Sequence, residues 1–266
     1  MLKMENVTYI YEDKTIALNN VNIDLSKGKK IGIVGSNGAG KSTLFMNFLG
    51  LLKPTKGKII YMGEDLKYDK KTLRDLRKNV GIVFQDPDKQ IFFSNVYDDI
   101  AFALRNLKYN ENEIKERVSM AMSKTNITDL KNKPVHFLSY GQKKNVSIAG
   151  TVAMDNKLMF FDEPTAGLDY SSRENIKNIL NNLVEDENKS IVVSSHDMNF
   201  IYEMCDYIYV LNKGFVIAEG EVQNIFLKKE ILDEASLEEP FLIKAHKYLG
   251  VKICKNEKEL FENYNL

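Results

Sequence analysis

The stretch Gly35-Ser36-Asn37-Gly38-Ala39-Gly40-Lys41-Ser42-Thr43 decides the fold of this 266-residue chain. It fits the pattern Gly-x-x-x-x-Gly-Lys-[Ser/Thr] with no mismatch. Lys30–Val34, just before it, has the short apolar composition of a buried parallel strand. Apolar residues just after it repeat at helical spacing: Leu44, Phe45, Phe48 and Leu49. A strand, a glycine loop and a helix in this order predict a loop that binds phosphate.

Each residue type in this loop has a physical reason to be there. Gly35, Gly38 and Gly40 have no Cβ, so backbone N–H groups can curve around an anion. The following helix directs its positive dipole end at the same anion. Lys41 can add a full charge, and Ser42 can offer its hydroxyl to Mg²⁺. The alternative is a glycine-rich turn with a chance lysine, which is disfavoured because the motif and its flanks agree.

The bulk composition suits a soluble globular protein. The apolar fraction of 44% can supply a core, and 266 residues suffice for one large domain, or a domain plus an appendage. Lys+Arg and Asp+Glu are equal at 37 each, so no global charge favours nucleic acid or an anionic membrane. Cys205 and Cys254 are unclustered, as expected of free thiols in a reducing compartment. The histidines lie too far apart in sequence to suggest a metal site: His136, His196 and His246.

The chain shows no sequence signal for membrane insertion. The N-terminus lacks a basic segment followed by an apolar one, so we expect no signal peptide. No apolar run approaches the roughly 20 residues that span a bilayer. If this protein works at a membrane, another chain must hold it there.

Apolar runs and polar turns divide the rest of the chain into strands and helices. Alternation predicts two N-terminal strands joined by a polar turn, near Met4–Ile10 and Ala17–Leu25. Further strands are predicted at Lys58–Met62, Val80–Phe84, Lys157–Phe161 and Ser190–Ser194, and a hairpin at Tyr207–Leu211 and Phe215–Ala218. Helical periodicity is typical of Thr72–Lys78, Asp98–Leu107, Glu111–Lys124, Gly141–Met154 and Ser171–Glu187.

This order of elements predicts an α/β fold. Its sheet is mainly parallel, with an N-terminal antiparallel β subdomain and a helical subdomain inserted at about residues 86–156. Residues 220–266 form a short, charged, helical extension in which Pro240 sits where a helix could start. This extension is short for a core of its own, so we expect it to pack on the main body or on a second copy of the chain.

Two adjacent carboxylates form the second chemical signal. Asp162 and Glu163 directly follow the apolar run Leu158–Phe161, which is predicted to be a buried strand. They therefore lie at the carboxyl end of that strand, and open parallel sheets bind their ligands at the carboxyl ends of their strands. Asp162 can steady the Mg²⁺ of a bound nucleotide, and Glu163 can activate a water that attacks the γ-phosphate. The alternative is a solvated acidic pair at a strand end. The phosphate loop in the same chain favours the functional interpretation.

The stretch Leu138-Ser139-Tyr140-Gly141-Gln142 is the third signal, and with it the chain resembles the ATP-binding cassette (ABC) ATPases over essentially its whole length. The resemblance implies a P-loop NTPase core in residues 1–219, with ATP and Mg²⁺ as cofactors. It also implies that Ser139, Gly141 and Gln142 face the γ-phosphate held by a second subunit. The chain departs from the family at Tyr140, where glycine is usual, and at Asn145, where arginine is usual. An ordinary helix N-cap at Ser139 is compatible with the same residues.

Four further residues match the family singly. Gln85 resembles the glutamine that senses Mg²⁺ and touches the membrane partner, although a polar residue often begins a loop. Asp169 ends a segment that resembles the loop communicating across the dimer, although it could simply cap a helix. His196 follows a predicted strand and resembles the histidine that hydrogen-bonds the γ-phosphate, although a lone histidine is usually structural. Tyr11 resembles the aromatic residue that stacks on adenine.

Within the family, the chain is similar to energy-coupling factor (ECF) transporters, a group that includes cobalt and nickel importers. The stretch Phe84-Gln85-Asp86-Pro87-Asp88-Lys89-Gln90-Ile91-Phe92 carries this likeness, and Asp86–Phe92 is where a coupling helix of the membrane subunit would press. Residues 220–266 resemble the extension through which such ATPases pair. The implied partners are a second ATPase subunit, identical or not, a transmembrane coupling subunit and a separate substrate-binding membrane subunit. The implied location is the cytoplasmic face of the membrane.

The predicted function is therefore ATP hydrolysis that powers an importer for a metal ion or a vitamin. Lys41 and His196 would stabilise charge on the γ-phosphate, Glu163 would activate water, and Ser42, Gln85 and Asp162 would hold Mg²⁺. One alternative is an ABC ATPase acting on nucleic acid or the ribosome, which zero net charge disfavours. The other is an ATP switch that does not hydrolyse, which the intact Glu163 disfavours and Tyr140 keeps open.

Overall fold

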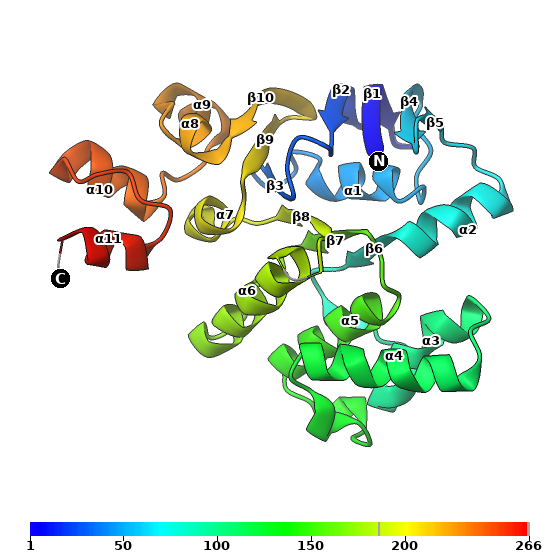
Figure 1. The fold of residues 1–266 in the computed structure, drawn as a ribbon. Coiled ribbons are helices and arrows are strands. Elements are labelled where there is room, and N and C mark those ends of the chain that lie inside the picture. The colour runs from blue at the N-terminus through cyan, green and yellow to red at the C-terminus, as the bar shows by residue number, and fades with distance from the viewer. Residues whose placement is uncertain (186, 265–266) are drawn as a thin grey trace. The chain divides into compact units, whose positions relative to one another are not determined.

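The computed structural model describes residues 1–185 and 187–264 of the chain (Figure 1). These residues form two compact units, and each is described by itself. The first unit comprises residues 1–68 and 193–266, and the second comprises residues 69–192. The chain thus leaves the first unit after Tyr68 and returns to it at Val193. The mixed α/β class predicted from the sequence is confirmed.

An antiparallel sheet in the first unit has the strand order β2-β1-β4-β5. Its strands are β1 (Leu2–Ile10), β2 (Ile16–Asp24), β4 (Lys56–Tyr61) and β5 (Glu64–Asp65). Met4 of β1 pairs with Ile23 of β2 and with Ile59 of β4, and all three side chains are buried. This alternation of buried and exposed residues is what made the two N-terminal strands predictable.

The phosphate loop belongs to a second group of strands in the same unit. The strand β3 (Lys30–Val34) runs parallel to β9 (Tyr207–Asn212), with Val34 opposite Val210. The strand β10 (Phe215–Glu221) pairs with β9 as the predicted hairpin. The helix α1 (Lys41–Phe48) follows the loop, and α7 (Met198–Met204) follows β8 (Ser190–Ser194), which runs across the boundary between the units.

The C-terminal extension is helical, as predicted. It contains α8 (Val222–Phe226), α9 (Lys229–Ala235), α10 (Phe241–Leu249) and α11 (Glu257–Tyr264). The hydroxyl of Tyr202 in α7 donates a hydrogen bond to the Cys254 carbonyl at 2.8 Å, and the Phe241 amide donates to Asn199 Oδ1 at 2.6 Å. The extension therefore packs on the main body of its own chain. The boundary at residue 220 and a dimer contact stay predictions.

The second unit contains helices and a parallel strand pair, while a helical insert with bounds at about 86–156 stays a prediction. Its helices are α2 (Lys70–Asn79), α3 (Val96–Asn106), α4 (Glu111–Lys124), α5 (Tyr140–Ala153) and α6 (Tyr170–Glu185), with short 3-10 turns η1 (Pro87–Lys89), η2 (Thr128–Leu130) and η3 (Val135–Phe137). The strands β6 (Val80–Val83) and β7 (Leu158–Asp162) are parallel, and every residue of β7 is buried. No helix among residues 1–185 and 187–264 is both long and apolar enough to cross a membrane.

Helix boundaries differ from the predicted ones by a few residues because side-chain caps set them. Asn95 accepts a hydrogen bond from the Tyr97 amide at 2.9 Å, so α3 begins at Val96, two residues earlier than predicted. The prediction that the helix after Asp169 continues to Glu187 is wrong. Glu187 lies in a turn, where its carboxylate pairs with Lys124 at 2.9 Å and with Lys189 at 2.8 Å.

Candidate nucleotide-binding site

The phosphate loop has the geometry that its glycines predict. The buried strand β3 leads into the loop, and α1 begins at Lys41 with Gly40 as its N-cap in a left-handed conformation, φ 106°. A Cβ at Gly40 would lie 2.5 Å from the Ala17 carbonyl oxygen, and one at Gly35 would lie 2.4 Å from that of Leu211. Both positions therefore require glycine. Since Gly40 has no side chain, the first amides of α1 face the loop without a side-chain cap, which suits an anion.

The structure brings Lys41 and His196 together, although they are far apart in sequence. The Lys41 side chain is buried, with 8% of its surface exposed. Its Nζ donates hydrogen bonds to the carbonyls of Gly35 at 2.7 Å and Ser36 at 3.1 Å, and lies 3.4 Å from His196 Nε2. His196 follows β8 and is exposed. Two groups that can carry positive charge thus meet at the phosphate loop, which is what stabilising a γ-phosphate requires.

Tyr11 is attached to the same loop through Thr43. The Tyr11 hydroxyl and Thr43 Oγ1 lie 2.9 Å apart, and the Tyr11 ring packs edge-on against Tyr9 with 5.0 Å between centroids. Tyr11 is exposed, and so is Ser42. An exposed aromatic face beside the loop suits stacking on a base. The adenine contact of Tyr11 stays a prediction.

In the second unit, β7 delivers the two carboxylates predicted to act on the nucleotide. Asp162 and Glu163 are only 9% and 6% exposed, so the alternative of a solvated acidic pair is wrong. Glu163 has a positive φ of 46°, a strained conformation for a residue with a Cβ. Such strain persists where the surrounding structure over-determines it, and it is commonest at functional sites.

Leu138–Gln142, which we call the signature stretch, leads into the N-terminus of α5. The Ser139 Oγ accepts a hydrogen bond from the Gln142 amide at 3.3 Å, and Gln142 Oε1 accepts one from the Ser139 amide at 3.0 Å. This reciprocal capping box confirms the N-cap interpretation of Ser139. Asp169 likewise accepts from the Ser172 amide at 2.8 Å, so it caps α6 as the alternative proposed. Capping does not test the predicted nucleotide contacts of Ser139, Gly141, Gln142 and Asp169, which stay predictions.

Gln85 is exposed, and the helix α5 holds its main chain. The Gln85 carbonyl accepts hydrogen bonds from the Tyr140 hydroxyl at 3.2 Å and from Lys144 Nζ at 2.7 Å. Burial lowers the pKa of Lys144 to about 8, and the charges of Asp162, Asp86 and Glu163 oppose this shift. Lys144 was not among the site residues predicted from the sequence. Its spacing of four residues from Tyr140, on one helix face, was the available signal.

Each unit has oxygen donors of the kind that Mg²⁺, the metal ion implied by the fold, prefers. Ser42 in the first unit, and Gln85 and Asp162 in the second, offer hydroxyl, amide and carboxylate oxygens, which Mg²⁺ prefers. Across the described residues there is no cluster of three His, Cys, Asp or Glu side chains that could hold a metal ion. Mg²⁺ that accompanies a nucleotide is usually bound by one or two protein ligands together with phosphate oxygens.

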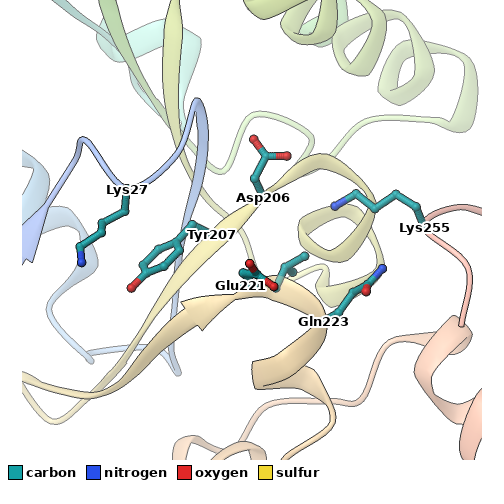
Figure 2. A pocket seen from close by; sticks show the side chains of 7 residues that line it. Lys27, Asp206, Tyr207, Glu221, Gln223 and Lys255 are labelled. Atoms are coloured by element: carbon teal, nitrogen blue, oxygen red, sulfur yellow. The ribbon is translucent and has the colours of Figure 1, made fainter.

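A hollow of about 330 Å³ in the first unit is a different feature (Figure 2). In Figure 2, Lys27 and Tyr207 lie on one side of it, and Lys255 and Gln223 lie on the other. Lys255 comes from the C-terminal extension and donates a hydrogen bond to the Cys205 carbonyl at 2.5 Å. Its lining mixes lysines with the carboxylates of Asp206 and Glu221 and includes no residue of the phosphate loop, so it is not the nucleotide site.

Known proteins resemble the chain across almost its entire length. The cobalt import ATP-binding protein CbiO of Salmonella paratyphi A is 41% identical over 98% of this chain and 96% of its own. The ECF transporter ATP-binding protein EcfA of Methanosphaera stadtmanae is 43% identical over 91% of this chain and 87% of its own. These names agree with the resemblance to the ECF and cobalt importer group that the sequence motifs suggested.

Solved structures share the fold. Clostridium perfringens cbiO1, described as part of the transporter complex cbiONQ, matches with a TM-score of 0.80 and 40% identity, covering 94% of this chain and 95% of its own. A dimeric ATP-binding cassette in a post-hydrolysis state, bound to ADP and Pi, matches with a TM-score of 0.76 and 29% identity over 84% of this chain and 99% of its own. The family model described as ABC transporter matches residues 18–166. The chain therefore belongs to the ABC transporter family, as one of its ATP-binding, ATP-hydrolysing subunits.

Proposed function

We propose that two cassettes, this chain and a second copy or a paralogue, enclose Mg²⁺-ATP and hydrolyse it to drive an importer. The observation that carries the catalytic assignment is the meeting of Lys41 Nζ and His196 Nε2, 3.4 Å apart, at the phosphate loop. The ammonium and the imidazole would neutralise charge that develops on the γ-phosphate. Mg²⁺, held by Ser42 with Gln85 and Asp162, would supply the further charge that phosphoryl transfer needs.

Glu163 is the proposed base. Its carboxylate is buried at the end of β7, so it can orient and polarise an attacking water without bulk solvent competing. Ser139, Gly141 and Gln142 of the second cassette would cover the same ATP with the N-terminus of α5. This arrangement explains why turnover would require two chains.

The experiment that tests this assignment is Glu163→Gln in the full chain. The amide keeps the shape of the carboxylate but cannot take a proton, so we expect turnover to fall by at least about 100-fold, in the range of removing a positioned base. The variant should still bind ATP and accumulate as a dimer, measured by light scattering with Mg²⁺-ATP. Glu174→Gln, which changes a glutamate whose side chain is 42% exposed and pairs only loosely with Lys177 (3.6 Å), is the matched control. Wild-type turnover in Glu163→Gln would refute the assignment.

The transmembrane partner would press on an aromatic patch of the second unit, which we define as Phe92, Phe93 and Phe102. Phe92 is 74% exposed, and its ring lies 6.1 Å from that of Phe102, centroid to centroid. The amides of Phe92 and Phe93 donate to Asp99 Oδ1 at 2.8 and 3.0 Å, which fixes the loop that presents the patch. The patch adjoins Asp86–Phe92, the segment predicted to meet a coupling helix, and exposed aromatic clusters suit protein partners.

The proposed cargo is a divalent metal ion, by likeness to the cobalt import protein, with a vitamin as the alternative. A separate membrane subunit would select it, and this chain would lie at the cytoplasmic face of the membrane. Uptake of labelled cobalt, nickel and a vitamin into proteoliposomes holding this chain and its co-purifying membrane proteins tests the cargo. ATP-dependent cobalt uptake is expected, and its absence beside vitamin uptake would replace the metal assignment.

A further inference from the structure

Tyr140 reaches two loops that the usual glycine at this position could not touch. It is the first residue of α5, and its hydroxyl donates to the Gln85 carbonyl oxygen at 3.2 Å. Its ring also lies against Gly167, since a Cβ at Gly167 would be 3.4 Å from Tyr140 Cε1. One side chain of the signature stretch therefore contacts both the loop after β6 and the loop after β7.

Lys144 reinforces the first of these contacts from one helical turn further along α5. Its side chain is 0% exposed, and its Nζ donates to the carbonyls of Gln85 at 2.7 Å and Phe84 at 3.0 Å. The Gln85 carbonyl thus receives two donors from the same helix face. A third side chain of this face, Lys143, pairs with Asp88 at 2.7 Å, but the Asp88 side chain is 58% exposed.

These contacts differ in how strongly they hold the loop. Hydrogen bonds from a charged donor are stronger than neutral ones, and a buried ammonium that loses its acceptors bears a large desolvation cost. If the Gln85 main chain moved away from α5, the buried Lys144 ammonium would lose this acceptor and bear that desolvation cost. The exposed pair of Lys143 and Asp88 adds little, because water competes for both groups. Of the contacts made by Tyr140, Lys143 and Lys144, those to the Gln85 carbonyl therefore hold the loop most strongly. Gln90 adds a further link, since its Nε2 donates to the Ser147 carbonyl of α5 at 3.3 Å.

We propose that Tyr140 and Lys144 are positioning residues that fasten the Gln85 main chain to helix α5. The segment Asp86–Phe92 and the N-terminus of α5 then move as one body. The transport part of this inference rests on the proposed function, since it assumes that a membrane partner presses on Asp86–Phe92. A push on that segment then displaces Ser139, Gly141 and Gln142 directly, without passing through the nucleotide. A glycine at position 140 would have neither the hydroxyl nor the ring that makes this link.

Hydrogen exchange in the full chain, without nucleotide or partner, tests the fastening alone. Several amides of residues 86–91 are hydrogen-bonded within the loop, for example Gln90 to the Pro87 carbonyl at 3.0 Å, so their exchange reports opening of this segment. Tyr140→Phe keeps the ring and removes one hydrogen bond, so we expect exchange there to quicken about fivefold. The matched control is Tyr109→Phe, because the ring of Tyr109 stacks on Arg117 in the same unit and survives the change.

Equal exchange in Tyr140→Phe and wild type would overturn the fastening. Lys144→Met should quicken exchange further, and a thermal melt checks that this variant is folded. The Tyr140→Phe result stands on its own if Lys144→Met does not fold.

The second measurement uses the chain in complex with its co-purifying membrane subunits. In Tyr140→Phe, the ratio of partner-stimulated to basal ATP turnover should fall about fivefold, with the KM for ATP unchanged. An unchanged ratio beside quickened exchange would overturn the mechanical link. If membrane subunits fail to stimulate even the wild type, the proposed transport function is what fails, and the exchange experiment still decides the fastening.

Discussion

Lys144 makes the stability of the protein depend on pH in a way that a single variant can isolate. Its side chain is fully buried, and its pKa is lowered from 10.5 to about 8, chiefly by burial. In the unfolded chain the same ammonium is solvated and keeps the higher pKa. Between these two values the unfolded state binds more protons than the folded state, so the free energy of unfolding rises with pH.

The magnitude follows from the two pKa values. Integrating the difference in bound protons from pH 7 to 9.5, with 1.36 kcal/mol per pH unit and proton, gives roughly 2 kcal/mol of added stability. In Lys144→Met the side chain has no titratable group, so the variant lacks this pH-dependent gain in the free energy of unfolding. Burial also lowers the pKa of Lys255, which adds to the pH dependence of the unfolding free energy in the same direction. Lys255 is present in both wild type and Lys144→Met, so its contribution cancels in the difference between them.

The assay is urea unfolding at several pH values between 7 and 9.5, followed by far-UV circular dichroism, because the chain contains no tryptophan. The difference in unfolding free energy between wild type and Lys144→Met should change by roughly 2 kcal/mol across this range, in favour of wild type as pH rises. Lys143→Met, which removes the neighbouring ammonium and leaves Lys144 in place, should follow wild type. Parallel pH profiles for wild type and Lys144→Met would refute the burial of an ammonium against the Gln85 carbonyl.

Three further changes test the phosphate loop and the partner surface. Gly40→Ala should lower the free energy of unfolding by more than about 2 kcal/mol, because the new Cβ would meet the Ala17 carbonyl oxygen at 2.5 Å. Gly38→Ala has open space around its Cβ and should lower it by only about 1–2 kcal/mol, because of its positive φ. Similar urea midpoints for the two variants would contradict this expectation. Lys41→Ala should abolish nucleotide binding or lower turnover by at least about 100-fold in a coupled ATPase assay, and wild-type activity would count decisively against the role of Lys41. Phe92→Ser should weaken co-purification with the membrane subunits several-fold while the exposed control Phe137→Ser does not, and equal recovery of both would remove the aromatic patch as the partner surface.

Much of the local structure could be predicted because the signals for it are local. The conformation of residues 35–43 depends on where the chain lacks a Cβ and on the strand and helix that flank it, and all of this is written in consecutive residues. Helical periodicity predicted the helix Glu111–Lys124 at its true boundaries, and in the structure a capping box of Asn110 and Glu113 starts it. The end of α6 was misjudged because Glu187 pairs with Lys124, 63 positions earlier, and with its neighbour Lys189, and helical periodicity carries no information on either ion pair.

By itself, the sequence determined that this chain has a phosphate loop, a buried strand ending in two carboxylates, and a serine-capped helix, since each depends on neighbouring residues. Only the tertiary structure decided that Lys41 meets His196, and that Lys144 and Tyr140 converge on the Gln85 carbonyl. These contacts join residues separated by 155, 59 and 55 positions in the chain. Whether such residues meet depends on how the strands and helices that carry them pack, because the free energy that brings them together is spread over the whole core.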